Sequence, residues 1–183
     1  MTYRVLPICG SLRVDSSNVG LLRMARRLAP TSLVIEQEFD LTSLPFYNLD
    51  LDRPGAEPDA VRDWRGRVAG ADAVLISTPE YNWSTPAVLK NALDWVTRPP
   101  GHHVLARKVV AVMSSSSKGG GAKVLAYLEE ILRLLGNTVV SEPVISLKMG
   151  AELVRPDGSA TDPTVEALVA ERMAALLAAL DKL

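Results

Sequence analysis

Residues 108–136 read KVVAVMSSSSKGGGAKVLAYLEEILRLLG and divide into three parts. The apolar run at 109–113 is continuous rather than alternating, as a strand buried on both faces requires. Serines and glycines follow, and then apolar residues recur at the spacing of one helix face until Gly136 ends the pattern. The stretch therefore predicts a buried strand, a loop and a helix that packs on the sheet.

The same strand-then-helix unit recurs along the whole chain. Runs rich in Val, Ile and Leu predict five strands, at 3–9, 33–39, 73–78, 108–114 and 138–145. Helical spacing predicts five helices, at about 17–29, 59–70, 86–97, 124–135 and 163–180. Strict alternation of this kind predicts an α/β three-layer sandwich, with helices on both faces of a five-stranded parallel sheet.

Length and composition agree with a folded domain. The chain has 183 residues, which predicts a single domain covering 1–183. Five strands in this length fit a flavodoxin-like sheet of order 2-1-3-4-5 better than a six-stranded Rossmann fold or a barrel. Lys and Arg number 20 against 21 Asp and Glu, so no positive excess favours binding to a nucleic-acid backbone.

The rare residue types exclude several kinds of site. Cys9 is the one cysteine, so an internal disulfide or a cysteine-based zinc site is excluded, and we expect a small core residue there. The apolar run at 5–9 is too short for a signal-peptide core, and no stretch approaches 18 apolar residues. We therefore expect a cytoplasmic protein that does not bind membranes.

Three polar loops follow the first, third and fourth predicted strands, at 10–18, 79–84 and 114–121. In an open parallel sheet, ligands bind beyond the carboxyl ends of the strands, where the strand order reverses. The first loop has three serines, one arginine and a following helix N-terminus, which together suit a phosphomonoester. It matches neither the dinucleotide fingerprint nor the P-loop, and an ordinary serine or asparagine helix cap is the alternative interpretation.

The other two loops could contact a planar ligand. Backbone groups of 79–84 can bind the edge of a heterocycle, and Tyr81 or Trp83 offers an aromatic wall. Taken alone, however, this loop is better interpreted as a plain turn before a helix at Pro86. The glycines of 119–121 permit close approach to a ligand, although alone they indicate only a flexible turn.

These stretches resemble the NAD(P)H-dependent FMN reductase family, which is flavodoxin-like and includes reductases of quinones, azo compounds and chromate. The matching motifs are Gly10-Ser11-Leu12-Arg13 with Ser16 and Asn18, Pro79-Glu80-Tyr81-Asn82 with Ser84 and Pro86, Leu89-Lys90-Asn91-Ala92, Asp94-Trp95, and the serine-glycine loop. The resemblance implies bound FMN, with its phosphate near Ser11, Arg13, Ser16, Ser17 and Asn18. It places the ribityl chain and ring near Pro79, Glu80, Tyr81, Asn82, Ser115, Ser116, Ser117, Gly119 and Gly120.

The resemblance also implies that NAD(P)H and then a small acceptor use one site in turn, with no catalytic side chain and no metal. Asn82 and the amides around Ser115 and Ser116 are the candidates for stabilising reduced flavin. A flavodoxin-type electron carrier is one alternative, although such carriers are typically acidic. A serine hydrolase using a serine of 114–117 with His102 or His103 is another, but the Gly-x-Ser-x-Gly motif is absent.

One further expectation concerns assembly. Trp83, Val88, Leu89, Trp95 and Val96 give the segment after the second loop more apolar surface than one helix face buries under a sheet. Large apolar patches commonly contact another protein. We therefore predict a homodimer or homotetramer with the second loop near the interface.

Overall fold

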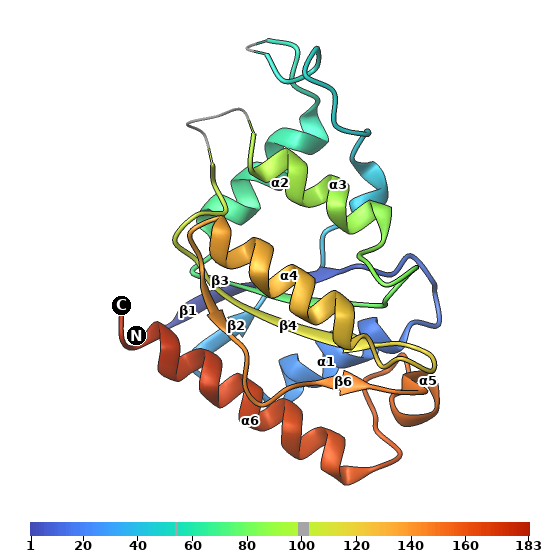
Figure 1. Cartoon of the computed structure of the whole chain (residues 1–183). Helices are drawn as coiled ribbons and strands as arrows, with labels where there is room; N and C mark the ends of the chain where they lie inside the picture. Colours follow the sequence, from blue (N-terminus) through green and yellow to red (C-terminus); the bar gives the residue numbers. More distant parts are fainter. Residues whose placement is uncertain (54, 99–102) are drawn as a thin grey trace.

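The computed structural model describes residues 1–53, 55–98 and 103–183. Its parallel sheet contains β1 (Tyr3–Cys9), β2 (Leu33–Ile35), β3 (Ala73–Thr78), β4 (Val109–Ser115) and β5 (Thr138–Val140). The strand order is β2-β1-β3-β4-β5, and every neighbouring pair is parallel (Figure 1). The predicted fold class and strand order are confirmed.

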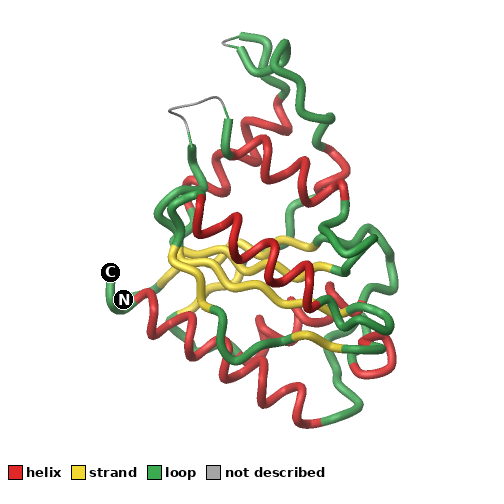
Figure 2. The backbone as a smooth tube through the Cα atoms, in the orientation of Figure 1, coloured by secondary structure: helices red, strands yellow, loops and turns green. Residues whose placement is uncertain are grey.

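Helices cover both faces of the sheet, which gives the predicted three layers (Figure 2). One face carries α1 (Ser17–Leu28) and α6 (Pro163–Leu180), and the other carries α2 (Asp59–Gly70), α3 (Ala87–Val96) and α4 (Ala122–Leu134). Two short elements were not predicted, the 3-10 helix η1 (Leu41–Ser43) and α5 (Gly150–Leu153). Among the described residues, no helix combines the length and the hydropathy needed to cross a membrane.

The central strand β4 shows why its sequence is continuously apolar. Val109, Ala111 and Met113 pack in the cluster that includes α1 and α6. Val110 and Val112 point the other way, into the cluster that includes α2, α3 and α4. Because successive strand residues face opposite sides and both sides are covered, every one of these positions is buried.

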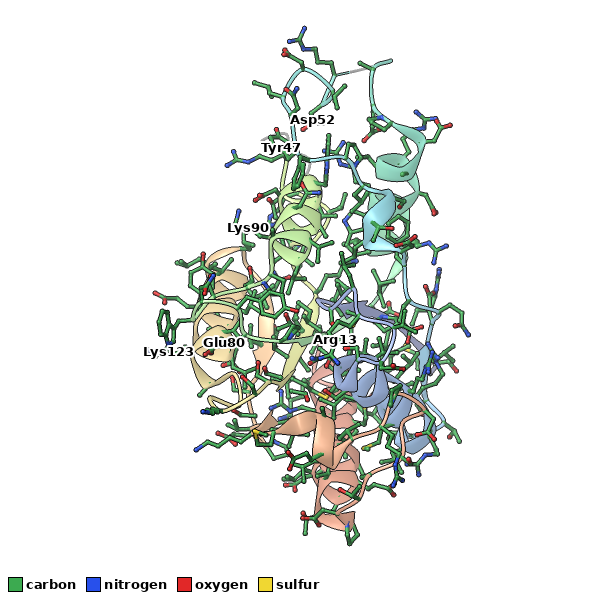
Figure 3. The ribbon with its side chains drawn as sticks, turned by 90° about the vertical axis from the view of Figure 1, so that its right-hand side faces the viewer. Arg13, Tyr47, Asp52, Glu80, Lys90 and Lys123 are labelled. Carbon is green, nitrogen blue, oxygen red and sulfur yellow. The ribbon has the colours of Figure 1, made fainter. Side chains whose placement is uncertain are left out.

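The predicted second strand is too long. It ends at Ile35 rather than at 39, because the pairing with β1 stops at the Val5–Ile35 pair and the residues that follow, Glu, Gln and Glu, are poor strand formers. Glu36 instead accepts a hydrogen bond of 2.7 Å from Nε of Arg4 near the sheet edge. The segment between β2 and α2, called the β2–α2 segment below, runs outside the sheet. Tyr47 and Asp52 belong to this segment and lie at the top of Figure 3.

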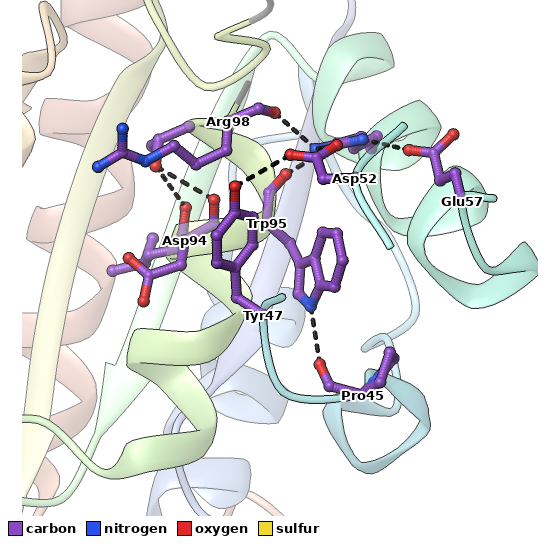
Figure 4. A network of polar contacts seen from close by, with 10 residues as sticks. Pro45, Tyr47, Asp52, Glu57, Asp94, Trp95 and Arg98 are labelled. Atoms are coloured by element: carbon purple, nitrogen blue, oxygen red, sulfur yellow. Dashed lines mark hydrogen bonds and ion pairs between the residues drawn. The ribbon is translucent and has the colours of Figure 1, made fainter. Parts of the chain in front are cut away.

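An ion pair between Asp52 and Arg65 holds the β2–α2 segment against α2 and α3 (Figure 4). Arg65 of α2 donates to Asp52 Oδ1 at 2.9 Å and to the carbonyl of Trp95 at 2.8 Å, and it also pairs with Glu57. The indole N–H of Trp95 donates to the carbonyl of Pro45 at 2.7 Å. Tyr47 lies edge-on to the Trp95 ring, with 4.9 Å between the ring centroids. The β2–α2 segment therefore covers the outer side of α3.

This cover overturns the sequence argument for an interface at the second loop. Leu89, Trp95 and Val96 are buried inside their own chain, and Val88 packs against the same core. Of the five residues behind that argument, only Trp83 is strongly exposed, at 69%. The sequence argument was wrong because α3 is covered on both sides. The sheet buries one face of the helix, and the β2–α2 segment buries side chains on the outer face that would otherwise be exposed to solvent.

The predicted fifth strand is broken in two. β5 ends at Val140, residues 141–145 leave the ladder, and β6 (Ser146–Leu147) returns to pair with β4. The guanidinium of Arg172, on α6, donates to the carbonyls of Val140 at 2.7 Å, Ser141 at 2.8 Å and Pro143 at 3.0 Å. Arg172 is 1% exposed, and burial lowers the pKa of its guanidinium. Arg172 thus replaces the hydrogen bonds that the missing strand would have made.

We expect Arg172→Met to lower the free energy of unfolding by about 3–5 kcal/mol, because several buried carbonyls lose their donor and each costs roughly 1–3 kcal/mol. Arg172→Lys should recover only part of this loss, since an ammonium group cannot reach the carbonyls with a planar fork. Urea unfolding followed by circular dichroism measures both. Glu171→Gln, on the exposed side of the same helix, is the control. An Arg172→Met variant as stable as that control would contradict the role of Arg172.

Candidate functional site

A cavity of about 300 Å³ opens at the carboxyl ends of β1, β3 and β4. This edge faces the viewer in Figure 3, where Arg13 lies near the centre and Glu80 to its left. All three predicted loops contribute to the cavity, together with the turn after β6. The lining residues are Ser11, Arg13, Ser16, Ser17, Asn18, Pro79, Glu80, Tyr81, Ser115, Ser116, Ser117, Met149, Gly150, Ala151 and Glu152.

Three of the predicted site residues do not line this cavity. Asn82 lies at the tip of a turn, and Gly119 and Gly120 lie in the part of the third loop that does not reach the cavity lining. The carbonyl of Gly120 accepts a hydrogen bond of 3.0 Å from Ser146 Oγ, which ties this part of the loop to β6. The remaining predicted residues are brought together as the sheet topology required.

The residues at 149–152 were missed by the sequence analysis. Met149 precedes α5 and the other three lie in its single turn, and four helical residues are too few to show a helical period. Their place beside the cavity depends on the break in the fifth strand, which brings β6 alongside the last residues of β4. A proline at 143, which cannot donate to a ladder, is the sequence signal for that break.

The first loop begins α1 with a capped N-terminus. Ser16 Oγ accepts a hydrogen bond of 3.2 Å from the backbone N–H of Asn18. Ser11 Oγ accepts from the N–H of Arg13 at 3.4 Å, and the hydroxyls of Ser17 and Ser115 lie 2.6 Å apart. Free amides at a helix N-terminus with hydroxyls and a guanidinium nearby suit an anionic oxygen cluster such as a phosphate.

Asn18 joins this loop to the strands beside it. Its amide nitrogen donates to the carbonyl of Ser115 at 2.9 Å, and its oxygen accepts from the N–H of Ser115 at 3.1 Å and from the hydroxyl of Ser77 at 3.0 Å. The side chain is buried, and its hydrogen bonds use one of the two N–H groups of the amide nitrogen and both acceptor positions of the oxygen. Asn18 therefore holds α1 against β3 and β4, and one N–H on the cavity lining keeps no partner among the described residues.

Glu80 joins the second loop to the third. Its N–H donates to Ser116 Oγ at 2.7 Å, and its Oε2 accepts from the N–H of Val124 at 2.9 Å, in the first turn of α4. A carboxylate at a helix N-terminus is favoured by the free amides and the helix dipole. Glu80 thus contributes its backbone to the cavity wall and its side chain to the loop's support.

Two predicted donors are already engaged. The N–H of Ser115 donates to Asn18, and the N–H of Ser116 donates to the carbonyl of Leu147 at 3.1 Å. Asn82 also lies outside the cavity, so its side chain and the amides of Ser115 and Ser116 themselves are not presented to the cavity in this structure. The sequence could not show this, because the partners come from α1 and from β6.

The second loop ends in a tight turn. Tyr81 and Ser84 exchange two backbone hydrogen bonds of 3.0 Å, and the φ angles of Asn82 and Trp83 are 50° and 62°. Positive φ at both central residues is the geometry of a type I′ turn. Tyr81 lines the cavity and is half exposed, whereas Trp83 lies away from the lining, with Lys123 Nζ 5.4 Å from its ring centroid.

Five lining side chains keep free ends. Among the described residues, no partner forms a hydrogen bond with the side chain of Arg13, Tyr81, Ser117 or Glu152, and Met149 is apolar. A cation, hydroxyls, an aromatic ring and an apolar wall in one cavity suit a ligand that has both a phosphate and a planar ring. The residues present therefore fit FMN.

The competing hydrolase arrangement is absent from the part of the chain that the structure describes. Ser114 Oγ donates to the carbonyl of Thr78, and Ser115 and Ser116 bond within the site. His103 is half-buried with Nε2 unpartnered among described residues, and burial lowers its pKa. His102 lies outside the described residues.

Other reactive centres are also missing from this site. Cys9 is half-buried outside the cavity, and burial raises the pKa of its thiol to about 11, so the thiolate is scarce near neutral pH. No group of His, Cys, Asp and Glu suited to a metal ion occurs in residues 1–53, 55–98 and 103–183.

Comparison with known proteins agrees with this geometry. The family model described as NADPH-dependent FMN reductase matches residues 3–152. An NAD(P)H:quinone oxidoreductase from Solanum tuberosum is 35% identical over 184 residues, covering 98% of this chain and 92% of the relative. An NAD(P)H-dependent FMN reductase from Pseudomonas aeruginosa is 33% identical over 173 residues, covering 94% of this chain and 92% of the relative. The solved structure of the flavoenzyme FerB, an NAD(P)H:(acceptor) oxidoreductase from Paracoccus denitrificans, has a TM-score of 0.87 and 33% identity and covers 99% and 98% of the two chains.

We expect Asn18→Ala to lower the free energy of unfolding by about 2–4 kcal/mol, because Ser77 and both backbone groups of Ser115 lose a buried partner at roughly 1–3 kcal/mol each. Chemical denaturation measures this loss. The matched control is Asn48→Ala, an exposed asparagine that accepts one hydrogen bond within its own loop. If the two variants were equally stable, Asn18 would not hold the loops together.

Proposed function

The chain belongs to the NADPH-dependent FMN reductase family, and we propose that the cavity beyond β1, β3 and β4 is its FMN site. It is an oxidoreductase whose cofactors are FMN and NAD(P)H. The observation that carries the assignment to this cavity is the free guanidinium of Arg13 beside the N-terminus of α1, at one end of a cavity with a free aromatic wall. We treat 1–183 as one FMN-binding domain in this proposal.

Each part of the cavity suits one part of FMN. The hydroxyls of Ser11, Ser16 and Ser17, with Arg13, would hold the phosphate. Pro79, the backbone of Glu80, Tyr81 and the serines at 115–117 would hold the ribityl chain and the ring. Asn18 would position these loops, and the remaining N–H of its amide would be available to the phosphate.

The chain itself supplies binding and orientation rather than a reacting side chain. When bound, FMN takes reducing equivalents from NAD(P)H and passes them to an acceptor. The hydroxyls of Tyr81 and Ser117 form no hydrogen bond within the described part of the chain, so they are available to a polar ring edge. The loops are held rigidly by Glu80 and Asn18, so the donors keep their positions during turnover.

We propose a small acceptor, namely a free flavin, a quinone, an azo compound or chromate. Quinones have the strongest support, because relatives from potato, rice and Escherichia coli are named as quinone reductases or quinone oxidoreductases. The net charge of −1 also differs from the strong acidity typical of flavodoxin-type electron carriers. A carrier remains the second candidate, and it would pass electrons to a protein partner.

Steady-state oxidation of NADPH and NADH with a benzoquinone acceptor tests the function. The proposal expects quinone-dependent oxidation that requires bound FMN. An electron carrier would show almost none, even when loaded with FMN. Adding excess free FMN to both reactions ensures that a low rate does not come from a missing cofactor.

We also propose a homodimer or homotetramer located in the cytoplasm. With the earlier motivation removed, support comes from α4, where Tyr127 and Leu134 are 41% and 80% exposed and lie seven residues apart on one helix face. A lone cysteine is compatible with a reducing compartment.

Light scattering at micromolar concentration should give at least a dimer, and Leu134→Glu should shift the protein toward the monomer. A monomeric parent chain would contradict the assembly.

Arg13→Ala should weaken FMN binding roughly 10- to 150-fold, because a hydrogen bond between charged groups contributes about 1.5–3 kcal/mol. The fold should survive, since Arg13 is exposed. Activity with saturating FMN should stay near that of the parent, because the phosphate lies far from the reacting part of the flavin. Titration of the apoprotein with FMN, and NADPH:quinone activity with and without excess FMN, measure both effects. Unchanged affinity would contradict the phosphate assignment.

A further inference from the structure

The turn that follows β6 forms a wall of the cavity that no sequence motif marked. Figure 1 shows α5 beyond the end of β6, at the edge where β4 also ends. The N–H of Met149 donates to the carbonyl of Ser117 at 2.9 Å, and the N–H of Gly150 donates to the carbonyl of Ser116 at 3.1 Å. The turn is therefore fastened to the third loop through its backbone.

Gly150 permits this close approach. A Cβ atom at this position would lie 1.9 Å from Ser115 Oγ and 2.9 Å from Ser115 Cβ. Because Ser115 is hydrogen-bonded to Asn18 and Ser17, moving it aside would disturb these contacts. Only glycine lets the turn pack directly on the end of β4, so Met149 lies on the cavity wall at a set position.

Met149 has an unfavourable backbone for its residue type. Its φ and ψ angles are 50° and 36°, in the left-handed region that glycine and asparagine occupy more readily. Its side chain is 45% exposed and lines the cavity, so burial within the chain does not offset the strain. Strained residues of this kind cluster at ligand sites, where the surrounding structure holds them in place.

We propose that Met149 contacts the flavin ring of bound FMN and closes the ring side of the cavity; this inference rests on the proposed function. Its backbone N–H is bonded to Ser117, one of the third-loop serines that the proposed function assigns to the ribityl chain and the ring. A thioether packs favourably against aromatic rings and adapts its shape to them. Met149 and Tyr81 are the larger of the lining side chains that offer apolar surface to a ring, beside Pro79 and Ala151.

The test is titration of apoprotein with FMN and with riboflavin, which has the same ring and no phosphate. Met149→Gly should weaken the binding of both flavins by the same factor, about tenfold, as expected for the loss of one apolar side chain from the contact. Met149→Leu, with similar volume, should stay within about threefold of the parent. Arg13→Ala should weaken FMN binding and leave riboflavin binding unchanged, because riboflavin lacks the phosphate.

Thermal unfolding of the apoprotein separates a lost contact from a lost fold. Met149→Gly should unfold at or above the parent temperature, because glycine relieves the positive φ. Met149→Asn, which tolerates the same backbone but has a polar side chain, should show the same loss of affinity for both flavins. Unchanged affinities, or a loss confined to FMN, would overturn the inference. A parent chain that binds neither flavin would instead refute the proposed function on which it rests.

Discussion

The side-chain amide of Asn18 is the contact on which the candidate site depends. It joins the first turn of α1 to the carboxyl ends of β3 and β4 through three buried hydrogen bonds. The parallel sheet brings these strand ends to one edge, but it does not set the positions of the loops that follow them. Asn18 fixes the first loop against the third, and Glu80 fixes the second against the third. Three separate loops thereby form one rigid cavity.

A second constraint acts at the far edge of the sheet. Arg172 satisfies the carbonyls exposed where the fifth strand breaks, and this lets β6 rejoin the sheet beside the last residues of β4. The turn after β6 then lies against Ser115 and Ser116 and completes the cavity wall. A buried arginine that never touches the cavity thus determines which residues line it. Both ends of the site therefore depend on polar groups that are buried and hydrogen-bonded within the chain.

The sequence predicted the architecture and most of the cavity, because both depend on local patterns. Strand and helix periods gave β1, β3 and α2 with their observed bounds, and polar loops after buried strands marked the site. Long-range partners caused the errors. Arg172 lies about thirty residues from the carbonyls it serves, so the fifth strand looked continuous despite Pro143. The partners that occupy the amides of Ser115 and Ser116, and the loop that buries Trp95, are equally invisible to a local pattern.

The central claim is that the three loops joined through Asn18 and Glu80 form a single FMN site. The most direct measurement is the chromophore of the protein as purified, recorded by absorption, released by denaturation and identified by chromatography. The account predicts oxidised flavin bands, one FMN per chain after reconstitution, and loss of those bands when NADPH is added without oxygen. A colourless protein that takes up no added FMN, or a coloured one that releases FAD, would contradict it.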